Sequence, residues 1–176
     1  MKIPAKLNSF LVKNKVKFEA VSHRTVYTAL DKAATLKIKP SLIAKTLVLK
    51  VGKDATMVVL PANRNLDKGK FKKAARAKSF DFISEKVMKT KFKGFNTGAI
   101  PPFGELFKMP CLIDKRLLKE KLVYISSGNY KSSLKISPKI FEKLKSLKAD
   151  ISVAKKIKAP KKRRAKKNPP RRRMRR

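Results

Sequence analysis

The chain has 176 residues and carries 48 Lys and Arg against 11 Asp and Glu, which gives a net charge of +37. This length suits one domain with a substantial buried core, and the charge favours a polyanionic partner such as RNA, DNA or an acidic membrane surface. One cysteine excludes an internal disulfide, and one cysteine with one histidine cannot supply four zinc ligands. We therefore expect no metal, no cofactor and a reducing, cytoplasmic location, and no apolar run approaches the ~20 residues of a membrane span.

Helix and strand signals interleave from the N-terminus. Apolar residues at i, i+3 and i+4 predict a helix over Ala5–Asn14. Alternation predicts a short strand over Lys17–Val21. Thr28 and Asp31 resemble a capping box, which predicts a second helix that ends near Leu36.

The middle of the chain predicts a hairpin followed by helices. The β-rich runs Thr46–Val51 and Ala55–Leu60 flank a turn at residues 52–54. A basic helix is predicted over Lys68–Ala77, and another begins at Ser84. Residues 93–104 contain three glycines and two prolines without periodicity, which indicates a loop.

The last part of the domain returns to strands. Strands are predicted over Cys111–Ile113, Leu122–Ser126 and Ser133–Ile136, a helix over Lys139–Leu147 and a final strand over Asp150–Val153. Strands and helices thus interleave irregularly along the chain. This order predicts a mixed α+β or α/β fold built on a mixed sheet.

A composition break near Val153 divides the chain into a domain over residues 1–153 and a tail over residues 154–176. Residues 155–176 hold seven Lys, seven Arg and no acid, a charge of +14, so +23 remains on residues 1–154. Such a tail cannot bury a core and is expected to be disordered. Its cations are expected to bind nucleic acid: Lys161, Lys162, Arg163, Arg164, Lys166, Lys167, Arg171, Arg172 and Arg173. A nuclear import signal or a generic polyanion-binding tail is the alternative.

Familiar catalytic signatures are missing from the sequence. It has no phosphate-binding glycine loop, and any Ser-His-Asp triad would have to use His23, the one histidine. An isolated histidine near a strand end is more often a surface or packing residue. Cys111 follows Pro110 in an apolar strand, which favours a buried structural thiol over a nucleophile.

Three polar or glycine-rich segments remain as candidates for a site. Taken singly, each has an ordinary interpretation, namely a surface lysine or a turn. The first is Lys45-Thr46 at the head of an apolar strand. The second is a loop from Gly98 to Gly104 in which glycines permit close approach of a ligand and prolines stiffen the backbone. The third is a turn after a strand, at Ser127-Gly128.

Together, in this order and spacing, the three segments resemble the YbaK/prolyl-tRNA-synthetase-associated editing domain family, the ProX-like aminoacyl-tRNA deacylases. The resemblance spans roughly Ala5 to Val153. It implies a mixed sheet folded around a pocket and hydrolysis of the ester that joins a wrong amino acid to the 3′ end of tRNA. Alanine or cysteine on the tRNA for proline is the commonest substrate theme, and an aminoacyl-tRNA synthetase is a possible second partner.

The resemblance also implies roles for individual residues. Lys45 is the expected catalytic side chain, holding the terminal phosphate or the ester end of the substrate. The expected substrate-binding residues are Thr46, Gly98, Ala99, Ile100, Pro102, Phe103, Gly104, Ser127 and Gly128. Related sequences often place an acidic residue after the Ser/Ala-Gly turn, whereas residues 131–137 contain none; this departure bears on which amino acid is accepted.

Two other classes of function are compatible with the composition. A non-catalytic nucleic-acid-binding protein of the ribosome or of chromatin would also have a basic body and tail. A membrane-surface protein is less well supported, because the tail has almost no apolar residues to insert.

Overall fold

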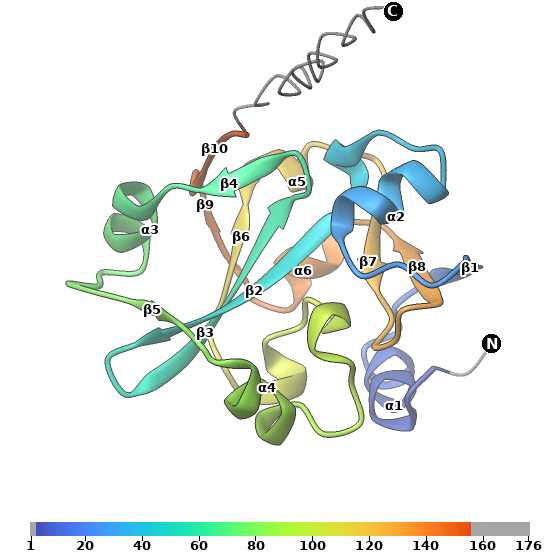
Figure 1. Cartoon of the computed structure of the whole chain (residues 1–176), viewed down its shortest axis with the longest axis horizontal. Coiled ribbons are helices and arrows are strands. Elements are labelled where there is room, and N and C mark those ends of the chain that lie inside the picture. Colours follow the sequence, from blue (N-terminus) through green and yellow to red (C-terminus); the bar gives the residue numbers. More distant parts are fainter. Residues whose placement is uncertain (1–2, 156–176) are drawn as a thin grey trace, which may run out of the picture.

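The computed structural model describes residues 3–155, which form a mixed α+β fold (Figure 1). The helices are α1 (Ala5–Lys13), α2 (Ala29–Thr35), α3 (Lys68–Ala74), α4 (Glu85–Lys91), α5 (Lys115–Leu118) and α6 (Lys139–Lys143), with short 3₁₀ turns η1 (Pro40–Leu42), η2 (Thr97–Ala99) and η3 (Glu105–Phe107). The strands are β1 (Phe18–Ser22), β2 (Ala44–Val51), β3 (Asp54–Pro61), β4 (Arg64–Leu66), β5 (Asp81–Phe82), β6 (Cys111–Asp114), β7 (Val123–Ser126), β8 (Ser132–Ile136), β9 (Leu147–Ala149) and β10 (Ser152–Ala154). Of the predicted tail, all but Ala154 and Lys155 lies outside the described residues.

Three sheets make up the β structure of residues 3–155. The largest has the order β5-β2-β3-β6-β9 and is mixed, because β3, β6 and β9 run parallel while β2 is antiparallel to its neighbours. A second sheet, β1-β8-β7, is antiparallel, and β4 pairs with β10. An isolated bridge from Ile43 to Tyr124 joins the start of β2 to β7. The two larger sheets therefore meet at the head of β2.

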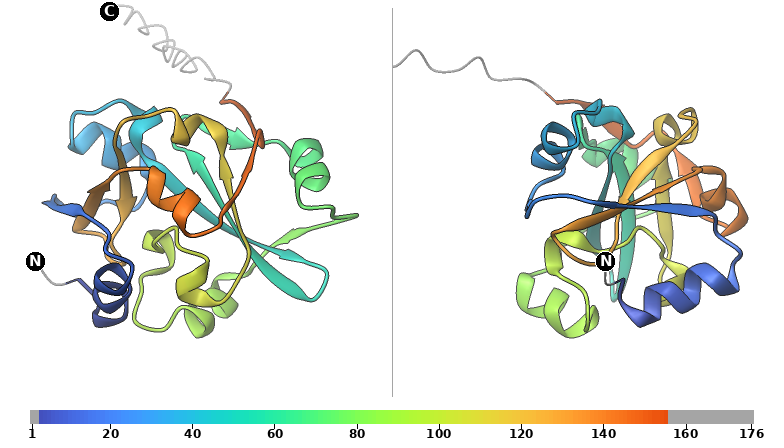
Figure 2. Two further views of the ribbon diagram at one scale, coloured as in Figure 1. Left: turned by 180° about the vertical axis from the view of Figure 1, so that it is seen from behind. Right: turned by 90° about the vertical axis from the view of Figure 1, so that its right-hand side faces the viewer.

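The core fills the space between these sheets. Leu7 and Leu11 of α1 are fully buried, and Phe103 stacks on Phe141 of α6 with ring centroids 5.9 Å apart. Helix α6 covers the side of the large sheet that faces the viewer in the left view of Figure 2. The predicted fold class is confirmed.

Element boundaries differ from prediction where the pairing is long-range. The helix predicted over Lys139–Leu147 ends at Lys143, and Leu147–Ala149 instead forms the edge strand β9 beside β6. Lys145 adopts a left-handed φ of 53°, which turns the chain out of the helix. Strands β4 and β5 were not predicted either, since each has at most three residues and is defined by its partner strand rather than by its own sequence.

Among the described residues, no helix is both long and apolar enough to cross a bilayer.

Candidate active site

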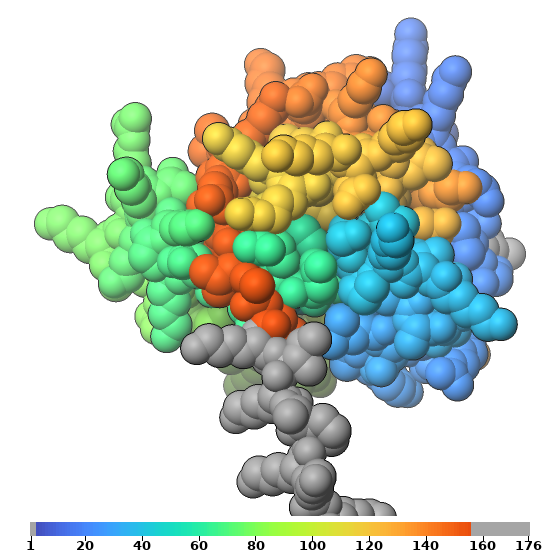
Figure 3. All heavy atoms as spheres, turned by 90° about the horizontal axis from the view of Figure 1, so that it is seen from above, coloured from blue at the N-terminus to red at the C-terminus, as the bar shows by residue number. Residues whose placement is uncertain are grey.

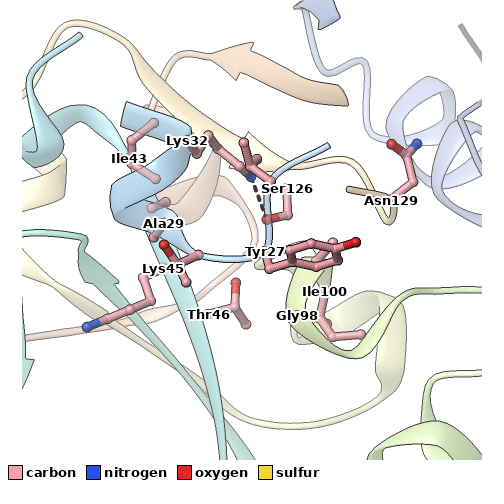
Figure 4. Close-up of a pocket in the computed structure, with 14 residues that line it drawn as sticks. Tyr27, Ala29, Lys32, Ile43, Lys45, Thr46, Gly98, Ile100, Ser126 and Asn129 are labelled. Carbon is pink, nitrogen blue, oxygen red and sulfur yellow. Dashed lines mark hydrogen bonds between the residues drawn. The ribbon is translucent and has the colours of Figure 1, made fainter. Parts of the chain in front are cut away.

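A cavity of about 230 Å³ lies where α2, the head of β2, the η2 loop and the end of β7 converge (Figure 4). Its lining residues come from these four parts of the chain: Val26, Tyr27, Thr28, Ala29, Lys32, Ile43, Ala44, Lys45, Thr46, Gly98, Ala99, Ile100, Ser126 and Asn129. The first two segments predicted to form a site therefore meet at one pocket, although they lie about fifty residues apart in the sequence.

Helix α2 is positioned by the predicted capping box. The Thr28 hydroxyl oxygen accepts a hydrogen bond from Asp31 N at 3.1 Å and its proton is donated to Asp31 Oδ2 at 2.6 Å. This cap starts the helix beside the pocket and directs Lys32 and Ala33 to its buried side.

Lys32 is the charged residue of the site that sequence analysis missed. Its side chain is only 6% exposed, and Nζ donates to Ser126 Oγ at 3.1 Å (Figure 4). Burial of the ammonium lowers the pKa of Lys32 to about 8. Ser126, which precedes the predicted Ser127 by one residue, is the serine that reaches the pocket.

Lys45 lies at the rim of the cavity. Its Nζ donates to the carbonyl oxygen of Arg64 at 2.8 Å, and in Figure 4 the side chain extends away from Thr46 and Ser126. Burial, and secondarily the nearby charge of Lys155, lower the pKa of Lys45. The rim therefore carries two neighbouring cations, one of them at the end of the described chain.

Thr46 turns its hydroxyl toward the cavity. In the part of the chain that the structure describes, Thr46 Oγ1 is the one buried side-chain nitrogen or oxygen without a hydrogen-bond partner. A buried polar atom without a partner is unfavourable by about 1–3 kcal/mol, so this position points to a ligand atom that would complete its hydrogen bonding.

Only the first half of the predicted glycine–proline loop lines the cavity, through Gly98, Ala99 and Ile100. Pro102, Phe103 and Gly104 are buried elsewhere. A Cβ on Gly104 would lie 2.5 Å from the Met109 carbonyl oxygen, so this glycine serves close packing.

The predicted Ser127-Gly128 turn supports the site from behind. Ser127 is fully buried and its hydroxyl contacts the Ser132 hydroxyl at 2.7 Å. Gly128 has a φ of +100°, and a Cβ there would meet Phe95 at 2.7 Å, so glycine is required. The N–H groups of Ala99 and Gly128 donate to backbone carbonyls at 2.8 and 3.0 Å, so these two amides are not available to polarise a substrate.

One of two adjoining tyrosines, Tyr27, lines the cavity. Tyr27 is 68% exposed and meets Tyr130 edge-to-face with ring centroids 4.9 Å apart. Tyr130 lines a neighbouring hollow of about 680 Å³, and Asn129 lines both. An exposed aromatic ring beside a small pocket is a surface on which a nucleobase can stack.

The histidine and the cysteine considered in the sequence analysis do not line this cavity. His23 Nδ1 donates to Arg24 O at 2.8 Å and Nε2 meets Ser133 Oγ at 2.9 Å, but Ser133 is fully buried, so the pair joins β1 to β8. Burial raises the pKa of the Cys111 thiol to about 11, which keeps it protonated. Among the described residues, no three His, Cys, Asp or Glu side chains gather where they could hold a metal ion.

Comparison with known proteins identifies the family. A sequence profile of the aminoacyl-tRNA editing domain matches residues 23–144, more than half of the chain and all of the lining residues. The chain belongs to this family. The fold agrees with solved structures of low sequence identity, which are evidence for the fold alone.

Two of these structures match almost over their full length. The hypothetical protein APE2540 is 22% identical, with a TM-score of 0.76 over 84% of this chain and 99% of that one. A protein described as a candidate trans-editing enzyme for prolyl tRNA synthetase is also 22% identical, with a TM-score of 0.72 over 85% of this chain and 96% of that one.

Proposed function

We propose that this editing domain is a deacylase, which hydrolyses the ester between a wrongly attached amino acid and the 3′ end of a tRNA. The observation that carries the proposal is the pocket of the editing domain, in which Lys45, Thr46 and Lys32 surround a cavity of about 230 Å³. This volume is below the ~300–1,000 Å³ of sites for drug-sized ligands. It suits an amino-acid side chain, while the nucleotide stays at the mouth.

The chemistry needs few catalytic groups. A water oxygen attacks the ester carbon, the bond from that carbon to the ribose oxygen breaks, and the water's protons end on the ribose hydroxyl and the released amino acid. The barrier falls when donors stabilise the negative charge that develops on the carbonyl oxygen. The Thr46 hydroxyl and the Lys45 ammonium are the side-chain donors that we assign to the ester end of the substrate.

The residues around the opening of the cavity suit the terminal nucleotides of tRNA. The exposed ring of Tyr27 can stack the terminal adenine, and Lys155, whose charge lies near Lys45, can hold a backbone phosphate. Alanine or cysteine on the tRNA for proline remains the prediction that the family resemblance makes for the amino acid.

The decisive experiment is a deacylation assay on a panel of mischarged tRNAs that includes alanine and cysteine on the tRNA for proline. Hydrolysis of at least one member, faster than in buffer, is expected. A protein that binds tRNA but accelerates no member of the panel would instead be the non-catalytic nucleic-acid-binding alternative.

Replacing Thr46 with valine tests whether the Thr46 hydroxyl donates a hydrogen bond to the ester end of the substrate. We expect kcat/KM for the best substrate to fall about tenfold, the effect of losing one hydrogen bond of about 1.4 kcal/mol. The free energy of unfolding should stay the same or rise by up to about 1 kcal/mol, because the variant buries no unpaired hydroxyl. Unchanged activity with raised stability would make Thr46 a packing residue.

The position of the C-terminal strand links the basic tail to the pocket. Arg64 on β4 donates to Ser152 Oγ on β10 at 2.7 Å, and Lys155 N donates to Asn63 O at 3.3 Å. Figure 3 shows this orange-red end of the described chain crossing the face that carries β4. Lys155, the last described residue, lies close enough to Lys45 to lower its pKa, and we infer that the cationic residues that follow it in the sequence bind tRNA.

Removing residues 156–176 should weaken tRNA binding and flatten its salt dependence. Each phosphate contact contributes a slope of about −0.9 for duplex or −0.7 for single strands in a plot of log K against log salt. The deletion removes thirteen cations, so the slope should become shallower by several units while kcat at saturating tRNA changes little. Filter binding at several salt concentrations measures this, and an identical slope would place the binding surface on the domain.

A further inference from the structure

The buried Lys32 is the feature of the pocket that the proposed hydrolysis leaves unused. It projects from α2 into the wall of the cavity and is 6% exposed. An ammonium group has three N–H donors and no acceptor, and Ser126 Oγ accepts one of them at 3.1 Å.

Within residues 3–155, no carboxylate neutralises this charge. None of the six ion pairs includes Lys32. The adjacent acid, Asp31, is exposed and bonds to Thr28. Burying an ammonium without a counter-ion is unfavourable, although with a pKa of about 8 the group is still mostly protonated at neutral pH. The arrangement is therefore complementary to an anionic ligand.

The cavity itself indicates which anion can reach Lys32. Apart from Lys32 and Ser126, the surrounding wall includes the apolar side chains of Val26, Ala29 and Ile43. A backbone phosphate is flanked by nucleosides on both sides, so it cannot enter a cavity of about 230 Å³ to meet a buried ammonium. An amino-acid side chain ends in a free group and can enter.

We propose that Lys32 and Ser126 form a carboxylate-binding subsite, so that the amino acid removed by this domain is one with an acidic side chain, aspartate or glutamate. The ammonium pairs with the carboxylate, and the Ser126 hydroxyl, which accepts from Lys32, donates its own proton to the second oxygen. This assignment rests on the proposed function. It departs from the small neutral amino acid implied by the resemblance, because a methyl group would leave the ammonium without an anion.

The test compares the same tRNA charged with glutamate, glutamine, aspartate, asparagine or alanine. Each acid and its amide have nearly the same shape, so the ratio of their kcat/KM values reports the effect of the side-chain charge. The kcat/KM for an acidic ester should exceed that for its amide by at least about tenfold, the contribution of a hydrogen bond between charged groups. In Lys32→Met the ratio of acid to amide should fall to about one. In Lys39→Met, at an exposed lysine, it should stay as in the parent protein.

A binding measurement separates this inference from the deacylase proposal. Calorimetry with 3′-glutamylamino-3′-deoxyadenosine and its glutaminyl analogue, whose amide links resist hydrolysis, should show the same preference and the same loss in Lys32→Met. Equal rates for acid and amide, or an equal slowing of every ester in Lys32→Met, would overturn the subsite while leaving a deacylase. If no ester is hydrolysed, the proposed function fails and the calorimetry decides the subsite by itself.

Discussion

Replacement of Lys45 by alanine is expected to lower kcat/KM for deacylation by at least about 100-fold, the usual effect of losing one donor to the transition state. The residue stands at the head of β2, where it pairs in register with Leu60, and its stem lines the pocket. Its ammonium is bound to the Arg64 carbonyl, and a flexible lysine can exchange that neutral acceptor for a substrate oxygen that carries more charge. Folding should survive, because the side chain is only half-buried.

The matched control is Lys50→Ala, since Lys50 lies on the same strand and is exposed. It should retain nearly full activity. Assays of both variants on the best substrate of the panel, with circular dichroism to monitor folding, give the comparison. If Lys45→Ala hydrolyses that substrate at a near-normal rate, the catalytic assignment of Lys45 is wrong, and Lys45 would only tie β2 to β4.

Local signals in the sequence predict those parts of the fold that depend on nearby residues. The hairpin of β2 and β3 follows from two β-rich runs around a tight turn, and α2 follows from the Thr28 cap. Strand β9 could not be predicted, because Leu147 continues an apolar helical pattern and becomes a strand only by pairing with Leu112. Tertiary pairing there overrides local preference.

Sequence likewise predicts those residues of the candidate site that a local pattern marks, and it misses one that only the tertiary fold buries. Lys45 and Thr46 stand out because they interrupt an apolar strand, and Gly98 lies in an evident loop. Lys32 does not stand out, because it is one of 48 cationic residues and no local pattern marks the one that is buried. Its burial follows from the docking of α2 against β7, which brings together residues 94 positions apart.

Lys32→Met should make the protein more stable at neutral pH while removing the proposed carboxylate preference. A residue kept for function at the expense of stability has this signature. The ordinary lysine pKa of 10.5 falls to about 8 in the folded chain, which corresponds to about 3 kcal/mol against the buried charge. Loss of the hydrogen bond to Ser126 offsets about 1 kcal/mol, so the free energy of unfolding should rise by about 2 kcal/mol at pH 7.

The same shift predicts how that difference changes with pH. Between pH 8 and 10.5, folded Lys32 loses its proton while the unfolded chain keeps it, so the stability of the parent protein rises with pH in this window. The methionine variant lacks this contribution, and its advantage should shrink from pH 7 to pH 10. Lys45 and Tyr27, the other titratable residues that line the pocket, are common to both proteins and largely cancel in the difference. Urea unfolding at pH 7, 9 and 10 measures it, and a difference that is constant with pH, or a less stable variant at pH 7, would contradict the buried charge.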